Sequence, residues 1–428
     1  MTGWLESHIM SAASSLFTSS QRRCHLLLLL YLPTSSLRIE RLAELNGVTV
    51  ETVKQDIAEV EEEIRRYHQL DLHWPTAESI ELRGAELNRR LCLLHTLRRG
   101  LRVSPDFVQQ HFAPVLRQTL GEKRVDKALY DEKNLQALIM HCAHRLQRTF
   151  APRDCLFLQI YMQFILGQAT ASEFNATQLQ WLADKPEREA ASELIGYWQK
   201  RCYPVPVETE VAFWTLLFCQ LHTPALQHDS HPSQQKLQQS IDALIARFEQ
   251  QAGTPFRDRT GLGTQLYCHM AQALERCHFD VGIDNTLTEE ITRLYPRLLR
   301  TTAVVLQPFA DEYCIRLSEE EVGLIAVIFG AWLMQENTLQ EKQVLLLTDD
   351  DRLLEQEIEQ QLREMTLLPL NISYQSTAAF QQQGAPKAVS LVISPYAITL
   401  PLYSPPLVHA ELPISVHQQQ RIRLLLES

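Results

Sequence analysis

An internal repeat constrains the fold of this chain more than any other feature of its sequence. Residues around Glu321 repeat those around Glu210 at an offset of 111 residues. A second pair of segments, around Tyr161 and His269, repeats at an offset of 108 residues. Solenoid repeats are shorter, at about 20–45 residues. The sequence therefore predicts two tandem helical domains in the middle of the chain, and a mainly α fold.

Length and composition indicate a folded protein with several domains. The chain has 428 residues, enough for roughly three or four domains, and 45% of them are hydrophobic. Its net charge of −11 argues against a broad electrostatic grip on nucleic acid, although a local basic face is compatible with it.

The cysteines and the apolar segments bear on compartment and cofactors. The nine cysteines are scattered, so we expect reduced thiols in a cytoplasmic protein and no metal site or cofactor. The apolar run from Leu26 to Leu32 is shorter than the about 20 residues that cross a bilayer, so no membrane contact is expected.

Residues 21–85 have the pattern of a winged helix-turn-helix, after a disordered tail over residues 1–20. Three helices are predicted at Arg22–Leu32, at Leu37–Leu45 and from an N-cap at Thr49 to about Tyr67. The short β-prone runs 70–72 and 79–82 follow as a candidate wing. The third helix buries a stripe made of Val50, Val53, Ile57, Val60 and Ile64.

The third helix also supplies the candidate DNA-binding residues. Those expected to face DNA are Thr49, Glu51, Thr52, Lys54 and Gln55, with Arg38 and Arg41 from the second helix. Acidic residues outnumber basic ones between Thr49 and Arg66, so phosphate contacts would fall to Arg22, Arg23, Arg38 and Arg41. The alternative is a helix-turn-helix retained only for packing or dimerisation.

The second copy of the repeat carries the segments 266–270 (LYCHM), 294–296 (LYP) and 317–322 (LSEEEV). With these motifs the chain resembles the PRD family, transcription regulators and antiterminators that contain phosphotransferase-system regulation domains. The resemblance implies a helical linker over 86–130, two PRD bundles over 131–236 and 237–340, and a homodimer. It also implies DNA and phosphotransferase proteins such as HPr as partners.

In that family each PRD carries two phosphorylated histidines. The corresponding positions here are Tyr161 and Leu217 in the first module, and His269 and Ile328 in the second. Only His269 keeps an imidazole, so it is the candidate regulatory phosphohistidine. The alternative is a semi-buried histidine that is hydrogen-bonded and silent.

Residues 341–428 read as a small α/β domain. Strands are expected at 343–347, 372–374 and 389–393, with helices at 353–365 and 417–426. The segment resembles the EIIB-like domain of some PRD activators, in which a phosphorylated cysteine follows the first strand. Thr348 stands there in this chain, followed by Asp349, Asp350 and Asp351. These aspartates leave a Mg²⁺ or phospho-aspartate site open as an alternative.

Two functions compete. The first is a PRD-containing transcription regulator whose phosphorylation sites are mostly degenerate. The second is a protein-interaction module that does not bind nucleic acid. No catalytic residues are predicted and we expect no enzyme, because GxSxG, HExxH, P-loop and Rossmann motifs are absent from the sequence.

Overall fold

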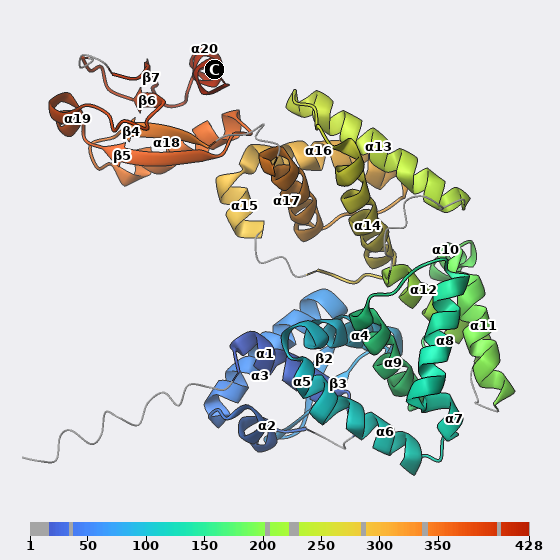
Figure 1. Cartoon of the computed structure of the whole chain (residues 1–428). Coiled ribbons are helices and arrows are strands. Elements are labelled where there is room, and N and C mark those ends of the chain that lie inside the picture. Colours follow the sequence, from blue (N-terminus) through green and yellow to red (C-terminus); the bar gives the residue numbers. More distant parts are fainter. Residues whose placement is uncertain are drawn as a thin grey trace, which may run out of the picture. The chain divides into compact units, whose positions relative to one another are not determined.

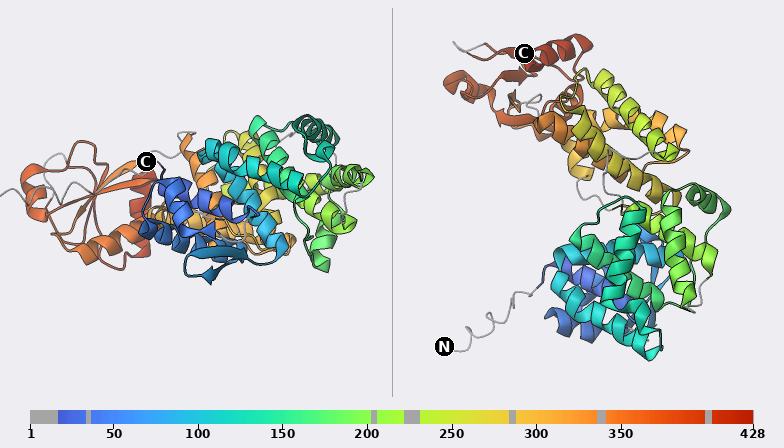
Figure 2. Two further views of the ribbon diagram at one scale, coloured as in Figure 1. Left: turned by 90° about the horizontal axis from the view of Figure 1, so that it is seen from below. Right: turned by 45° about the vertical axis from the view of Figure 1, so that its right-hand side comes forward.

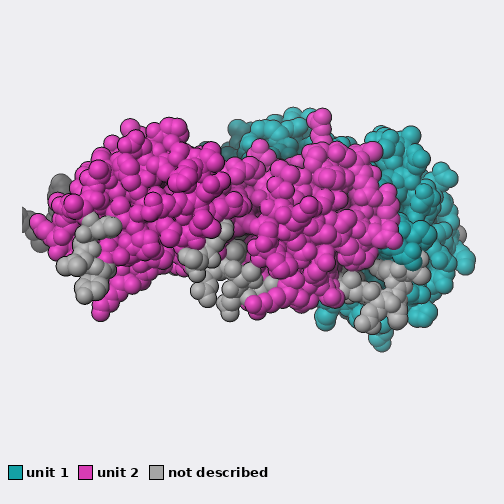
Figure 3. Space-filling view, turned by 90° about the horizontal axis from the view of Figure 1, so that it is seen from above, with its two compact units in different colours: residues 1–235, 270–284 teal, residues 236–269, 285–428 magenta. Residues whose placement is uncertain are grey.

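The computed structural model describes residues 17–33, 37–201, 206–221, 231–283, 288–335, 341–399 and 404–427. Residues 1–16 of the predicted tail lie outside these ranges. The fold is mainly helical, with a small parallel sheet near the C-terminus. The chain forms two compact units, residues 1–235 with 270–284 and residues 236–269 with 285–428 (Figure 3).

The first unit begins with three helices and a small sheet (Figure 1). In order, the elements are α1 (Ser19–Leu30), β1 (Leu37–Arg38), α2 (Ile39–Asn46), α3 (Val50–His68), β2 (Asp71–Thr76) and β3 (Ser79–Arg83). The strands are antiparallel in the order β1-β3-β2. Gly47 ends α2 with a φ of 61°, a left-handed conformation that glycine adopts without strain.

Local details differ from the sequence expectations at three places. Helix α1 starts at Ser19 rather than Arg22, because Thr18 and Gln21 form a capping box. Leu37 belongs to β1 and pairs with Ile80, so it is not in a helix. Val50, predicted to be buried, is 40% exposed at the first turn of α3. The predicted N-cap is confirmed, since Thr49 Oγ1 accepts from the Thr52 N–H at 3.2 Å.

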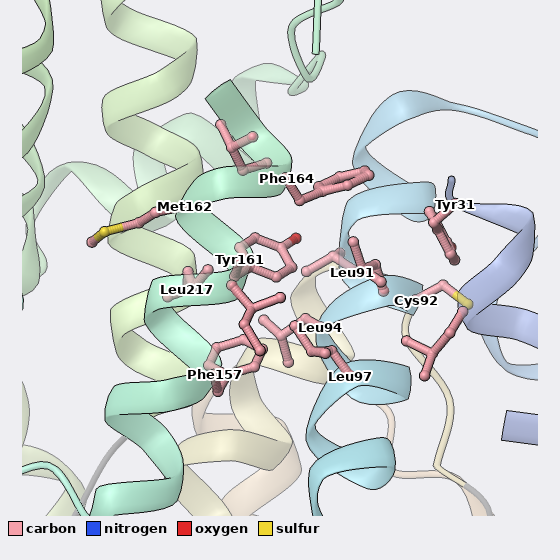
Figure 4. Close-up of a cluster of buried hydrophobic side chains, with 14 of the residues drawn as sticks. Tyr31, Leu91, Cys92, Leu94, Leu97, Phe157, Tyr161, Met162, Phe164 and Leu217 are labelled. Carbon is pink, nitrogen blue, oxygen red and sulfur yellow. The ribbon is translucent and has the colours of Figure 1, made fainter. Parts of the chain in front are cut away.

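The segment after the sheet is α4 (Glu86–Val103), α5 (Pro105–Phe107), a π-helical turn at Val108–Phe112, α6 (Ala113–Glu122) and α7 (Lys127–Tyr130). Helix α4 packs against α1 on one side and α9 on another. One continuous hydrophobic core therefore joins the N-terminal elements to the first helical module (Figure 4).

In the part of the chain that the structure describes, each of the two repeats contributes five helices. The first has α8 (Glu132–Arg145), α9 (Pro152–Leu166), α10 (Ala176–Ala183), α11 (Glu187–Lys200) and α12 (Val207–Gln220). The second has α13 (Pro232–Ala252), α14 (Arg259–His278), α15 (Thr288–Leu294), α16 (Pro296–Glu312) and α17 (Glu319–Gln335). The aligned residues Glu210 and Glu321 both lie in the first turn of the fifth helix.

The C-terminal domain is a three-layer α/β structure (Figures 1 and 2). Its elements are β4 (Lys342–Leu347), α18 (Arg352–Met365), β5 (Leu370–Gln375), α19 (Thr377–Gln383), β6 (Leu391–Ser394), β7 (Leu407–His409) and α20 (Val416–Glu427). All strand pairs are parallel, in the order β5-β4-β6-β7. Helices α18 and α20 cover one face through Ile358 and Ile422, and α19 covers the other through Phe380.

Within the described ranges, no helix is long and apolar enough to cross a membrane. The eight cysteines that fall in these ranges are free thiols, and Cys202 lies outside them.

Candidate functional site

His269 lies on α14 and faces the start of α17. Its Nε2 is 3.1 Å from Oε2 of Glu321, and the two side chains are 17% and 5% exposed. The backbone N–H of Glu321 donates to Ser318 Oγ at 3.2 Å, which fixes the first turn of α17. A carboxylate at Nε2 holds the proton on that nitrogen and leaves the lone pair on Nδ1. His269 is therefore an oriented imidazole with partial access to solvent.

The corresponding position in the first module is fully buried. Tyr161 lies on α9 with no exposed surface, and its hydroxyl donates to the carbonyl of Arg90 at 2.6 Å. Figure 4 shows its ring among apolar side chains, with the hydroxyl directed toward α4. Burial raises the pKa of Tyr161 well above 10, so the hydroxyl stays protonated. Neither access nor a nucleophilic nitrogen is present at this position.

The carboxylates that correspond in the two repeats have different partners. Glu321 contacts a histidine of its own module, whereas Glu210 binds Nη1 of Arg90 on α4 at 2.8 Å. Arg90 and Glu210 are each 2% exposed. Burial raises the pKa of Glu210, and the neighbouring guanidinium of Arg90 opposes that rise. The equivalent carboxylate therefore contacts a histidine in the second module and forms an ion pair with α4 in the first.

The residues that the family resemblance places at the second histidine position, Leu217 and Ile328, are apolar in both modules. Leu217 on α12 is fully buried, and Ile328 on α17 is 8% exposed. Both belong to the hydrophobic surface of their helices and have no group that could accept a phosphoryl group.

The candidate DNA-binding residues lie at the start of α3, on α2 and at the end of β1. Glu51, Lys54 and Gln55 are exposed, and Thr52 is half-buried beside the N-cap Thr49. Lys54 is 4.0 Å from Glu51. Arg38, expected in the second helix, is the last residue of β1 and is exposed. On α2, Arg41 pairs with Glu44 at 3.5 Å with 63% of its side chain exposed.

Three of the carboxylates of α3 are neutralised by arginines from other helices. Asp56 binds Arg22 at 2.7 Å, Glu59 binds Arg23 at 2.7 Å and Glu63 binds Arg99 at 2.7 Å. The remaining charged residues of the helix are Glu51, Glu61 and Glu62 against Lys54, Arg65 and Arg66, so they balance.

These ion pairs correct the sequence interpretation in two ways. The outward face of α3 is neutral rather than acidic. Arg22, predicted to contact phosphate, is 11% exposed and bound to Asp56. Arg23 is also paired and is 32% exposed, whereas Arg41 is 63% exposed within its pair, so Arg38 and Arg41 are the more accessible cations of that predicted set.

The loop after β4 has structural partners for most of its polar groups. Thr348 is 1% exposed and its hydroxyl donates to Glu355 at 2.7 Å. Asp349 accepts from the Thr377 N–H at 2.7 Å, and Asp351 caps α18. No group of three or more potential metal ligands occurs in the described part of the chain. The acidic loop is therefore built into the connections to α18 and α19.

Sequence reasoning missed Arg90, which fell in the predicted linker. The available signal was an arginine beside an apolar run on a predicted helix, where a charge is buried only when it is paired. Its partners Glu210 and Thr170 are more than 70 residues away in the chain, and such distant pairing is not visible in local patterns.

Comparison with known proteins defines the family. The PRD domain family matches residues 242–332, which span most of α13–α17. The family described as the C-terminal domain of the stationary phase-inducible protein CsiE matches residues 342–426. CsiE of Escherichia coli (strain K12) is 47% identical over 421 residues, covering 97% of this chain and 99% of that protein. The chain belongs to the CsiE family.

A more distant similarity links the CsiE family member described here to a regulator. A probable licABCH operon regulator of Bacillus subtilis (strain 168) is 21% identical over 327 residues. That match covers 74% of this chain and 48% of the regulator, so it concerns only part of the Bacillus protein.

Proposed function

We propose that this protein is a PRD-type transcription regulator that binds DNA through its N-terminal elements. One observation carries the proposal. The element order α1-β1-α2-α3-β2-β3, with β1 and β2 on either side of β3, agrees with the order expected for a winged helix-turn-helix and supports this reading. The PRD match and the similarity to an operon regulator support the regulatory role.

In this proposal α3 enters the major groove with Lys54 and Gln55 at its exposed start. Gln recognises adenine and Lys recognises guanine at base edges. Arg38 and Arg41 supply phosphate contacts, since Arg22 and Arg23 are held in ion pairs and are only 11% and 32% exposed, whereas Arg41 is 63% exposed. Few phosphates are then neutralised, so binding is weak and its salt dependence has a slope of about −0.9 per contact.

Phosphorylation of His269 supplies the proposed regulatory input. A phosphoryl group carries about −1.5 to −2 charges. Placed on the imidazole that contacts Glu321, it sets two negative groups against each other where the carboxylate is nearly buried. Like charges in such a site repel strongly. The contact between α14 and α17 would then rearrange, which is a switch with a local electrostatic cause.

We assign the domains of the chain by the resemblance to the PRD family. Residues 21–85 are the winged helix, 86–130 the linker, 131–236 and 237–340 the PRDs, and 341–428 an EIIB-like domain without its cysteine. The protein is proposed to be a cytoplasmic homodimer with HPr-type partners and no enzymatic activity. The parallel order β5-β4-β6-β7 supports a doubly wound origin for the last domain.

The second candidate function is a protein-interaction module without nucleic-acid binding. The neutral outward face of α3 and the small number of exposed cations near it favour this alternative. Both candidates use the same fold, and the binding assay below separates them.

The test is a gel shift of the full chain on genomic DNA fragments at several salt concentrations. We expect retarded fragments at low salt and loss of binding as salt rises. Lys54→Ala should weaken binding about tenfold, whereas Lys133→Ala, which removes an exposed lysine of α8, should not. No retarded fragment at any salt concentration would reject the regulator and favour the interaction module.

A further inference from the structure

A solvent-open cavity of about 920 Å³ lies beside α4 and α9 in the first unit. Its polar lining consists of His95, Arg98, Arg99, Arg102, Arg153 and Asp154. Leu101, Phe157 and Ile283 add apolar surface. The volume is within the range of about 300–1,000 Å³ that is usual for small-molecule sites.

The cavity concentrates positive charge in an acidic protein. Four arginines line it and Asp154 is the single carboxylate among the lining residues, while the whole chain carries −11. Asp154 is 3.5 Å from Arg98, and Glu63 pairs with Arg99 from α3. Arg102 and Arg153 have no carboxylate at ion-pair distance among the described residues. At least two positive charges therefore remain unbalanced at the cavity.

Arg99 also has unused donors. Its Nε and Nη2 are buried without a hydrogen-bond partner in the described structure. The neighbouring thiol of Cys24 donates to the carbonyl of Thr96 at 3.6 Å, and a thiol is only a weak acceptor. Buried donors without partners cost free energy, so an acceptor that reached them would be bound favourably.

Histidine side chains complete the polar surroundings. The rings of His68 and His95 are 5.7 Å apart, and His68 Nδ1 is buried without a partner. Burial lowers the pKa of His95 well below 6.5, and the neighbouring His68 ring and the guanidinium groups of Arg276, Arg98 and Arg99 lower it further. A neutral imidazole can still donate one hydrogen bond to an anion.

We propose that this cavity binds a small organic phosphate, with Arg98, Arg99 and Arg102 around the phosphate group. Guanidinium groups bind phosphate through paired, charge-assisted hydrogen bonds. Phe157 and Ile283 would contact the organic part. A small molecule fits better than a nucleic-acid backbone, because Arg98 and Arg99 are only 35% and 24% exposed. This site is separate from the proposed DNA contact and does not depend on it.

The test measures binding to the full chain by calorimetry and by thermal shift. The probes are adenosine 5′-monophosphate and glucose 6-phosphate, with adenosine, glucose and inorganic phosphate as comparisons. We expect saturable binding of at least one organic phosphate and a rise in Tm, with no effect of adenosine or glucose. Binding of inorganic phosphate alone, or of no probe, overturns the proposal.

Variants locate the site. Arg102→Gln and Arg153→Gln change exposed residues and should fold, and together they should weaken probe binding at least tenfold. Arg99→Gln should abolish it, provided that its far-ultraviolet circular dichroism matches the parent. Arg421→Gln, an exposed arginine of α20, is the matched control and should bind normally. The assignment is contradicted if the Arg102→Gln/Arg153→Gln variant binds the organic phosphate as well as the Arg421→Gln control does. It is also contradicted if the cavity variants lose DNA binding but still bind the organic phosphate.

Discussion

Replacing Arg90 by methionine should destabilise the first unit more than any surface change. The side chain makes four contacts: Glu210 at 2.8 Å, Glu86 at 3.1 Å, the Thr170 carbonyl at 2.8 Å and the ring of Phe213 at 4.9 Å. Arg90→Met retains most of the volume but leaves Glu210 as a buried charge without its partner. Breaking a buried ion pair from one side costs about 3–5 kcal/mol.

The expected change in melting temperature follows from the size of the unit. A loss of 1 kcal/mol lowers Tm by about 2–4 °C for a domain of 150–250 residues. Arg90→Met should therefore lower the Tm of the first unit by roughly 10 °C in a calorimetric scan. Arg117→Met is the matched control, because its ion pair with Glu132 is 41% and 57% exposed. Exposed pairs contribute about 0–1 kcal/mol.

The sign of the pH dependence is also fixed. Burial raises the pKa of Glu210, and loss of Arg90 raises it further. A carboxyl with a raised folded-state pKa destabilises the fold as pH rises through that pKa. The loss of unfolding free energy caused by Arg90→Met should therefore be larger at pH 8 than at pH 5.

A double variant tests the cause. Arg90→Met with Glu210→Leu removes both charges and should recover most of the lost stability, since an apolar pair can replace a buried ion pair. The reasoning is refuted if Arg90→Met costs no more than Arg117→Met, or if the double variant is no more stable than the single one.

Two further predictions concern stability. Burial and the nearby Arg99 lower the pKa of His68 from 6.5 to about 4. This shift does not change the free energy of unfolding above pH 7 and lowers it by about 3 kcal/mol once the pH falls to 4. In urea unfolding, His68→Gln should lack this part of the acid destabilisation, and an equal loss of stability with falling pH in both proteins would contradict the prediction. Gly282→Ala would place a Cβ 2.6 Å from Tyr67 Cδ1 and should cost about 1–3 kcal/mol, whereas Gly196→Ala, at a helical position with open space, should cost less in the same chemical-denaturation assay.

Much of the secondary structure could be predicted from local patterns, and the misses have identifiable physical causes. The strand at Lys342–Leu347 and helix α18 follow from an apolar run and a strong 3.6-residue period. Strand β7 has only three residues and follows two prolines, so no local pattern marks it. Leu37–Arg38 became a strand because pairing with β3 overrides helix propensity.

The candidate sites were predictable only where one residue type decides the chemistry. Tyr161, Leu217 and Ile328 exclude histidine phosphorylation by their identity alone. The groups that these side chains contact depend on the tertiary structure and could not be predicted, as the hydrogen bond from the Tyr161 hydroxyl to the Arg90 carbonyl illustrates. Likewise, the arginines of α4 are adjacent in sequence, but Arg153 joins their cavity from another helix.

The central claim is that His269 is the one remaining phosphoacceptor of the two modules. The direct measurement is the intact mass of the chain, under alkaline conditions, after incubation with phosphoenolpyruvate, Enzyme I and HPr. The account predicts one acid-labile phosphoryl group at most, its loss in His269→Ala, and no label in His269→Ala/Tyr161→His because position 161 is fully buried. Two or more such groups in the modules, or labelling that persists in His269→Ala, would contradict it.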